Sequence, residues 1–228
     1  MKVTKDFVFF WKTEEVFSQW HPSTFIVDGI IFKTAEQYMM YHKAIFFGDT
    51  ESAKKVLETT DPREQKKIGR AVKNFDAVRW AAVAKDVVYA GNKAKFTQNA
   101  DMLKQLLRNS GKEYVEASPY DNIWGIGIGE NDSRIYDKSQ WQGTNWLGEI
   151  LTKLRNELFT GPWRSPSYSE EAQKEIVEIT IQKLEEQNKK YKDVLTKWCT
   201  LCEEADMRPE DECSELYHLS KETLRGDI

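Results

Sequence analysis

The sequence predicts a helix-rich α+β domain with a small β-sheet over residues 1–160, followed by a helical C-terminal extension over residues 165–228. Before residue 160, short runs of β-branched and aromatic residues alternate with longer segments whose apolar residues recur at helical spacing. Near residue 160 the composition changes. The stretch LFTGPWRSPSYSEE contains a Gly-Pro, a Ser-Pro and a Ser before a pair of Glu, which is typical of a linker that leads into a helix.

Local signals predict each element of the first part. FVFFW has the composition of a short strand, and FIVDGIIFK has that of a β-hairpin with its turn at Asp28-Gly29. Thr34 is a helix-capping residue, and we expect the helix that follows it to continue to residue 47. The same reasoning predicts helices over residues 50–60, 62–72, 75–96, 99–110 and 144–159, and a strand over residues 112–118.

Bulk composition limits the classes of function. The chain has 228 residues, of which 40% are hydrophobic, so it can bury a sizeable core. Its net charge is −4, which is not the basic balance of a general nucleic-acid-backbone binder, although a pocket for one nucleotide needs only local charge. No apolar run reaches the length of about 20 residues that a membrane span needs, and we expect no signal peptide. The three cysteines favour a reducing, cytoplasmic location without a disulfide framework.

The helix over residues 34–47 contains the first candidate site. Glu36 and Lys43 are seven residues apart, close to two helical turns, so both lie on one stripe among aromatic and Met side chains. Their Cα atoms are about 10 Å apart along the axis, too far for direct pairing, but the two side chains can converge on one small molecule. The alternative interpretation is a solvated Glu and a solvated Lys on an otherwise buried helix.

Two glycine-containing stretches are further candidates. In EASPYDNIWGIGIGE, polar and aromatic residues precede alternating glycines: Asp121, Asn122 and Trp124 come before Gly125, Gly127 and Gly129. Such glycines let the backbone approach a ligand and cradle a phosphate, and the alternative is a glycine-rich surface loop. In QWQGTNWLGE, we expect Thr144 or Asn145 to cap the last helix, where an anion can also bind; capping alone is the alternative.

Taken together, these stretches resemble the NADAR family, also called the YbiA-like family. The resemblance covers about residues 7–158 and depends on four segments in order: FSQWHPSTFIVDGIIFKTAEQYMMYHKA, DPREQKKIGRAVKNFD, NKAKFTQNADMLKQLLRNSGKEYVEASPYDNIWGIGIG and GTNWLGEILTKLRNEL. It implies an N-glycosidase that hydrolyses the bond between a ribose C1′ and a nitrogen. Two substrate classes are associated with the family: phosphoribosylamino-pyrimidine intermediates of riboflavin synthesis, and ADP-ribose attached to guanine in nucleic acid.

The resemblance also implies roles for particular residues. Glu36, Lys43 and Asp121 match functional positions of the family. Phe75 stands where the family has a Trp, which removes an indole N–H and leaves a stacking surface. The segment 130–144 is longer than in the shortest members, and we expect it to form one wall of the pocket. This longer segment favours the larger ADP-ribosyl-guanine substrate over the riboflavin intermediates.

A mechanism fits these residue types. Cleavage of an N-riboside passes through an oxocarbenium-like state at C1′. We expect Lys43, dehydrated by its apolar neighbours, to attack C1′ and form a Schiff base, with Glu36 as general acid/base. Asp121 is expected to orient the ribose hydroxyls or to share proton transfer. The other expected substrate contacts are stacking by Phe75 and Trp124, phosphate binding by Arg70 and Lys95, and contacts at Gly125, Gly127 and Asn145. For the two cations, ordinary surface charge is the alternative, and the mechanism needs no cofactor and no metal.

A rival from another class is a non-catalytic module that binds ADP-ribose or a nucleotide. It would keep the stacking aromatics and the glycines but would need neither Glu36 nor Lys43. A helical scaffold protein would leave the glycine run and the eight Trp residues without a purpose.

The C-terminal extension lies outside the resemblance. Cys199, Cys202, Cys213 and His218 are four potential zinc ligands, but their spacing is not a common finger pattern, so we expect buried thiols and a surface His. The long helix is expected either to pack on the catalytic domain or to make a homodimer contact.

Overall fold

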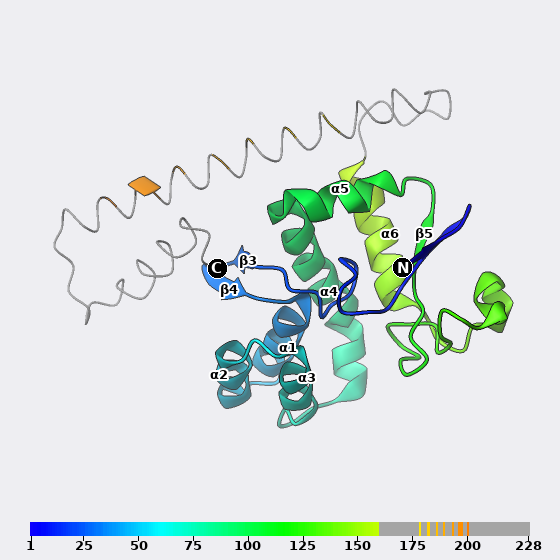
Figure 1. Ribbon diagram of the computed structural model, residues 1–228. Coiled ribbons are helices and arrows are strands. Elements are labelled where there is room, and N and C mark those ends of the chain that lie inside the picture. The colour runs from blue at the N-terminus through cyan, green and yellow to red at the C-terminus, as the bar shows by residue number, and fades with distance from the viewer. Residues whose placement is uncertain are drawn as a thin grey trace.

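The computed structural model describes residues 1–159 and eight isolated positions, 178, 182, 186, 189, 193, 196, 197 and 200 (Figure 1). The predicted linker, the packing or homodimer role of the extension, and the four candidate zinc ligands all lie outside the described residues. Within the described part, no helix is both long and apolar enough to cross a bilayer.

Helix α1 (Ala35–Phe46) is surrounded by three other helices, α2 (Thr50–Glu58), α3 (Pro62–Arg70) and α4 (Ala77–Gln98) (Figure 1). It begins as predicted, because the Thr34 hydroxyl accepts a hydrogen bond of 3.0 Å from the Gln37 backbone N–H. The next three helices each begin after an aspartate whose carboxylate accepts N–H groups of the first turn. These caps fix where the helices start and therefore which side chains of α1 and α3 face each other.

The described chain contains one small mixed sheet and one hairpin. Strands β1 (Lys2–Val3) and β2 (Phe7–Phe10) are antiparallel, whereas β2 and β5 (Glu113–Glu116) are parallel, with Phe10 paired to Glu116. Helices α1 to α4 and α5 (Ala100–Arg108) lie between the two parallel strands in sequence, and α6 (Trp146–Leu158) packs beside β5. Strands β3 (Phe25–Val27) and β4 (Ile30–Phe32) form the predicted hairpin, in which Asp28 and Gly29 both have positive φ, as a two-residue turn requires.

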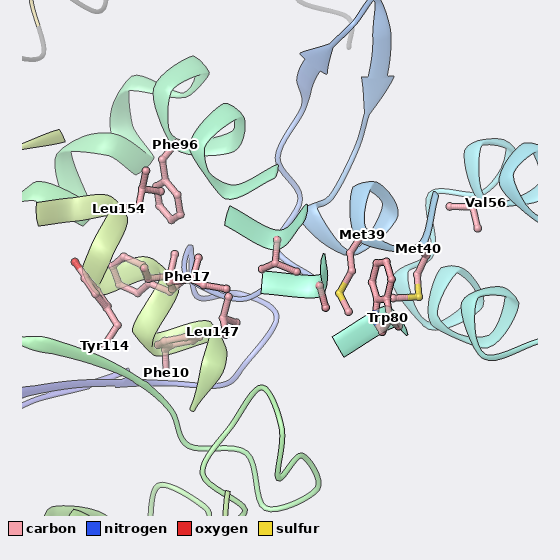
Figure 2. Packing of buried hydrophobic residues seen from close by; sticks show 14 of the residues in the cluster. Phe10, Phe17, Met39, Met40, Val56, Trp80, Phe96, Tyr114, Leu147 and Leu154 are labelled. Carbon is pink, nitrogen blue, oxygen red and sulfur yellow. The ribbon is translucent and has the colours of Figure 1, made fainter. Parts of the chain in front are cut away.

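The main core runs from α6 and β5 at one end to α1 and α2 at the other (Figure 2). Phe17 packs against Tyr114 with ring centroids 4.6 Å apart, and Leu147 and Leu154 of α6 lie close by. At the other end, Met39 and Met40 of α1 lie on either side of Trp80 of α4 (Figure 2). These three side chains also reach a cavity, so the end of the core is part of its wall.

The segment 130–144 does not form a wall of that cavity, and the prediction that it does is wrong. It folds into two short 3-10 turns, η1 (Ser133–Tyr136) and η2 (Lys138–Gln140), which cover the opposite face of the sheet. The Trp141 indole donates to the Ile135 carbonyl at 2.9 Å and packs against Phe7 with ring centroids 5.9 Å apart. The apolar residues of this segment pack onto the sheet, and the segment meets the site where Glu130 pairs with the cavity-lining Lys12 at 3.3 Å.

The predicted fold class, a helix-rich α+β domain with a small sheet, is confirmed. Every predicted helix and strand before residue 160 is present within a few residues of its expected bounds. Strand β1 and the two 3-10 turns were not predicted, because elements of two to four residues carry no periodic pattern.

Candidate active site

A cavity of about 740 Å³ opens between the segment after β2, helices α1, α3 and α4, and the segment after β5. Its lining residues are Trp11, Lys12, Thr13, Glu14, Ser18, Gln19, Trp20, Glu36, Met39, Met40, Lys43, Lys66, Arg70, Trp80, Glu116, Ser118, Tyr120, Asp121, Ile123 and Trp124. The set combines aromatic surfaces, cations and carboxylates, and its volume is that of a typical small-molecule site.

Glu36 lies in the first turn of α1 and is only 5% exposed. Its backbone N–H donates to the Gln19 carbonyl at 2.9 Å, which ties the start of the helix to the segment after β2. The carboxylate oxygen Oε1 is buried and has no hydrogen-bond partner among the described residues. Burial raises the pKa of Glu36 to about 7; the charge of Asp121 adds to the rise, and the Lys66 ammonium opposes it. This carboxyl can therefore accept or release a proton near neutral pH.

Lys43 lies two turns further along α1 and is 8% exposed. Its Nζ donates to the Gly69 carbonyl at 2.7 Å and sits 3.9 Å from the centroid of the Phe75 ring. Burial lowers the pKa of Lys43, while the charge of Glu36 opposes and that of Arg70 supports this shift. A lowered pKa increases the neutral, nucleophilic fraction of the amine at a given pH.

Gly69 explains how α3 comes close enough to hold this amine. A Cβ at this position would lie 1.9 Å from the Met40 sulfur and 2.8 Å from Met40 Cγ, so only glycine lets the two helices approach this closely. The close approach brings the Gly69 carbonyl within reach of Lys43.

The end of β5 and the segment after it supply two further carboxylates to the cavity. Asp121 shapes the segment, because its Oδ1 accepts hydrogen bonds from the backbone N–H groups of Ile123 (3.0 Å) and Trp124 (2.8 Å). Glu116, the last residue of β5, has a buried Oε2 without a partner among the described residues. Burial raises the pKa of Glu116 to about 8, with the charges of Asp121 and Glu36 adding to the rise and that of Lys66 opposing it. Glu36, Glu116 and Asp121 therefore line one cavity together with the buried amine of Lys43, which is a set suited to moving protons around a reacting bond.

Comparison with known proteins identifies the family. Residues 9–159 match the model of the NADAR domain. The chain belongs to the NADAR family. This confirms the resemblance stated from the sequence.

The relatives are similar to this chain over most of the NADAR domain. The Caenorhabditis elegans protein irg-1 is 38% identical over 198 residues, which cover 80% of this chain and 93% of that protein. An N-glycosidase of Acanthamoeba polyphaga mimivirus is 43% identical over 147 residues, which cover 62% of this chain and 86% of the viral protein. The solved structure of Escherichia coli YbiA, which is also named an N-glycosidase, superposes with a TM-score of 0.57 at 25% identity and covers 69% of this chain and 87% of YbiA. The chain is accordingly an N-glycosyl hydrolase.

The NADAR domain brings five of the ten predicted site residues to the cavity: Glu36, Lys43, Arg70, Asp121 and Trp124. Phe75 does not line the cavity itself, but its ring, 44% exposed, contacts the Lys43 ammonium at the edge of the site. Arg70 and Lys66 reach the cavity from α3, and neither forms an ion pair with a carboxylate in the described part of the chain.

The other four predicted residues do not line the cavity. Lys95 is fully buried, and its Nζ donates to the Ser18 carbonyl at 2.7 Å, so it supports the wall from behind and is not placed to bind phosphate. Gly125 and Gly127 belong to the segment after β5 and pack against protein atoms: a Cβ on Gly125 would lie 2.8 Å from the Glu116 carbonyl oxygen, and one on Gly127 would lie 3.0 Å from Gln142 Cβ. Asn145 precedes α6 with φ 53°, but its side chain makes no cap hydrogen bond; instead it bridges the Glu116 N–H and the Tyr114 carbonyl, both at 3.0 Å.

Sequence reasoning missed Gln19 and Glu116. The Asn92 side chain of α4 donates to Gln19 Oε1 at 2.9 Å, which leaves Gln19 Nε2 as a buried donor without a partner among the described residues. Both missed residues lie inside stretches quoted in the sequence analysis, Glu116 at the start of one and Gln19 near the start of another, but neither is part of a helical stripe or a glycine run. No group of three or more His, Cys, Asp and Glu side chains that would hold a metal ion occurs in the described residues.

Proposed function

We propose that this NADAR domain hydrolyses the bond between a ribose C1′ and a nitrogen of a base, with Lys43 as nucleophile and Glu36 as general acid/base. The observation that supports this most is the placement of both side chains, each less than 10% exposed, in one cavity of nucleotide size. Burial shifts both pKa values in the directions that these roles need: that of Lys43 down and that of Glu36 up to about 7.

The proposed reaction has two halves. Lys43 Nζ attacks C1′, a C1′–Nζ bond forms, and the bond from C1′ to the base nitrogen breaks. Glu36 accepts the proton that Nζ loses, and opening of the ribose ring converts the adduct to a Schiff base. Water then adds at C1′, and Glu36 returns its proton to Nζ as the C1′–Nζ bond breaks. The departing nitrogen also takes up a proton, so the reaction needs a second acid. Asp121 is proposed to orient the ribose hydroxyls from the segment after β5.

The mouth of the cavity favours an ADP-ribosyl substrate, and we propose ADP-ribose attached to guanine as its class. Trp11 and Tyr120 pack together there with ring centroids 5.9 Å apart, and Tyr120 is 88% exposed, so an aromatic surface is free to stack on a second base. Lys66 and Arg70 offer positive charge for phosphates, and so does Lys12, which pairs with Glu130 at 3.3 Å. The segment 130–144, which led us to expect the larger substrate, does not line the cavity.

A second candidate is a phosphoribosylamino-pyrimidine intermediate of riboflavin synthesis. It is favoured by a relative from Zea mays named as a chloroplastic riboflavin biosynthesis protein, which is 32% identical over 138 residues. These residues cover 58% of this chain but only 20% of the maize protein, so the likeness concerns one part of a longer protein.

Incubation of the purified chain with both substrate classes, followed by mass spectrometry of the released base and sugar, tests the proposal. Release of guanine and ADP-ribose is the expected result. Lys43→Met should lower kcat at least about 100-fold. Lys67→Met is the matched control, because Lys67 lies on the surface of α3, pairs with Glu64 at 3.1 Å and does not line the cavity.

Borohydride tests the covalent step. Reduction during turnover should link the sugar to Lys43 as a stable secondary amine, located by peptide mass spectrometry. Wild-type rates for Lys43→Met, or turnover without any trapped adduct on Lys43, would show that water attacks C1′ directly.

A further inference from the structure

The wall of the cavity contains buried polar atoms that the proposed roles of Lys43 and Glu36 do not explain. Three of its lining side chains have buried polar atoms without partners among the described residues: Gln19 Nε2, Glu36 Oε1 and Glu116 Oε2. A buried polar group left unpaired costs free energy, so a folded protein keeps such groups mainly where a ligand or water completes them. Glu116 is the one ionisable member of this set that the two-residue mechanism does not use.

The position of Glu116 along β5 sends its side chain toward the cavity. Val115 and Ala117 are buried in the small cluster on the other face of the sheet, whereas Tyr114 points into the main core. Because side chains alternate along a strand, Glu116 lies on the same face as Tyr114, one step closer to the end of the strand. That end opens into the cavity, where Glu116 is a lining residue.

The backbone of Glu116 is fixed on both sides. Its N–H donates to Asn145 Oδ1 at 3.0 Å, and its carbonyl accepts from the Ile126 N–H at 2.9 Å. Gly125 packs directly on that carbonyl: a Cβ there would lie 2.8 Å from the Glu116 oxygen. Gly125 and Asn145, which the sequence marked as ligand contacts, thus hold the strand end that carries Glu116.

We propose that Glu116 is a further catalytic residue, the acid that protonates the departing nitrogen. This inference rests on the proposed function. As the C1′–N bond breaks, the Glu116 carboxyl gives its proton to the base nitrogen, while Glu36 takes the proton from Lys43 Nζ. When water adds at C1′, the Glu116 carboxylate accepts the proton of the water. One water is consumed, and all three side chains return to their starting states.

The electrostatic surroundings agree with this role. Burial is the main reason why the pKa of Glu116 is raised; the negative charges of Asp121 and Glu36 add to the rise, and the Lys66 ammonium opposes it. A carboxyl that keeps its proton at neutral pH is ready to act as an acid.

The test compares two leaving groups. The first substrate, called the base substrate, carries a nucleobase: ADP-ribosyl-guanine, or the riboflavin-type pyrimidine if that is the compound cleaved. The second is the corresponding 4-nitrophenyl riboside, whose nitrophenolate leaves without taking up a proton. Glu116→Gln should lower the single-turnover rate of base release about 100-fold or more, and should lower the single-turnover rate of nitrophenolate release only a few-fold. Glu113→Gln, on the surface of the same strand, is the matched control and should act as the wild type on both.

Two further readouts keep the proposal testable if the nitrophenyl compound is a poor substrate. Glu116→Asp keeps a carboxyl and should retain more activity on the base substrate than Glu116→Gln, with both variants unfolding in one cooperative transition. Full activity of Glu116→Gln on the base substrate, or equal losses on both leaving groups, would overturn the role of Glu116. Undiminished activity of Lys43→Met would instead overturn the proposed function, so the two failures are distinct.

Discussion

Replacing Glu36 by glutamine is expected to remove activity and, at alkaline pH, to stabilise the protein. The pKa of Glu36 rises from 4.5 to about 7 on folding, chiefly because burial disfavours its charge. The folded state therefore binds the proton more tightly than the unfolded chain does. The stability that Glu36 contributes is fully present below pH 4.5 and is lost as the pH rises through 7. Glutamine is neutral throughout and escapes this loss.

The size of the effect follows from the two pKa values. Each pKa unit is worth about 1.36 kcal/mol, so ionisation of Glu36 destabilises the fold by about 1 kcal/mol at pH 5 and about 3 kcal/mol at pH 8. Glu36→Gln should therefore gain about 2 kcal/mol more at pH 8 than at pH 5. Loss of the Glu36 charge also eases ionisation of Glu116, which changes stability in the same direction.

Urea unfolding followed by tryptophan fluorescence at pH 5 and pH 8 measures the difference. Glu64→Gln is the control: Glu64 lies on the exposed side of α3, where it pairs with Lys67, and its loss should change stability by less than about 1 kcal/mol at either pH. A gain for Glu36→Gln that is equal at the two pH values, or a loss that grows with pH, would refute the conclusion that burial raises the pKa of Glu36.

Three further predictions concern the strand end and its supports. Gly148→Ala places a Cβ 2.1 Å from the Tyr114 carbonyl oxygen, so it should lower the free energy of unfolding by at least about 2 kcal/mol. Gly129→Ala is the control, because its Cβ would lie no closer than 3.7 Å to any neighbour. Equal melting temperatures of the two variants would contradict this. Asn145→Gly should be more stable than Asn145→Ala by about 1 kcal/mol in urea, because only glycine accepts φ 53° without strain, and both variants should lower kcat more than they raise KM. Burial raises the pKa of Glu116 to about 8, so kcat/KM on the base substrate should fall above pH 8 as this acid loses its proton. The residual activity of Glu116→Gln should lack that fall. A wild-type kcat/KM that still rises at pH 10 would count against Glu116 as the acid.

Much of the fold could be predicted because its elements begin and end with local chemistry. The Thr34 cap, the Asp28-Gly29 turn and the Pro62 start each depend on a few neighbouring residues, and each is present. Helical spacing also placed Glu36 and Lys43 on one stripe of α1, and the fold confirms that both face one cavity.

The contacts between residues that are distant in sequence could not be predicted from local patterns. Asn145 looked like a helix cap and Lys95 like a phosphate ligand, yet tertiary contacts use the first to hold β5 and bury the second behind Ser18. The aromatic residues of the segment 130–144 gave no indication of which surface they would cover.

The sequence by itself determined the elements, the family and the helix that carries Glu36 and Lys43, because these depend on the pattern of residues along the chain. Only the tertiary structure decided that β2 and β5 pair in parallel, and that this pairing delivers Glu116 to the cavity that contains Lys43. The physical reason is that the raised pKa values of Glu36 and Glu116 require burial and nearby charges. The residues that bury these carboxyls, and the charges beside them, come from segments that are distant in sequence.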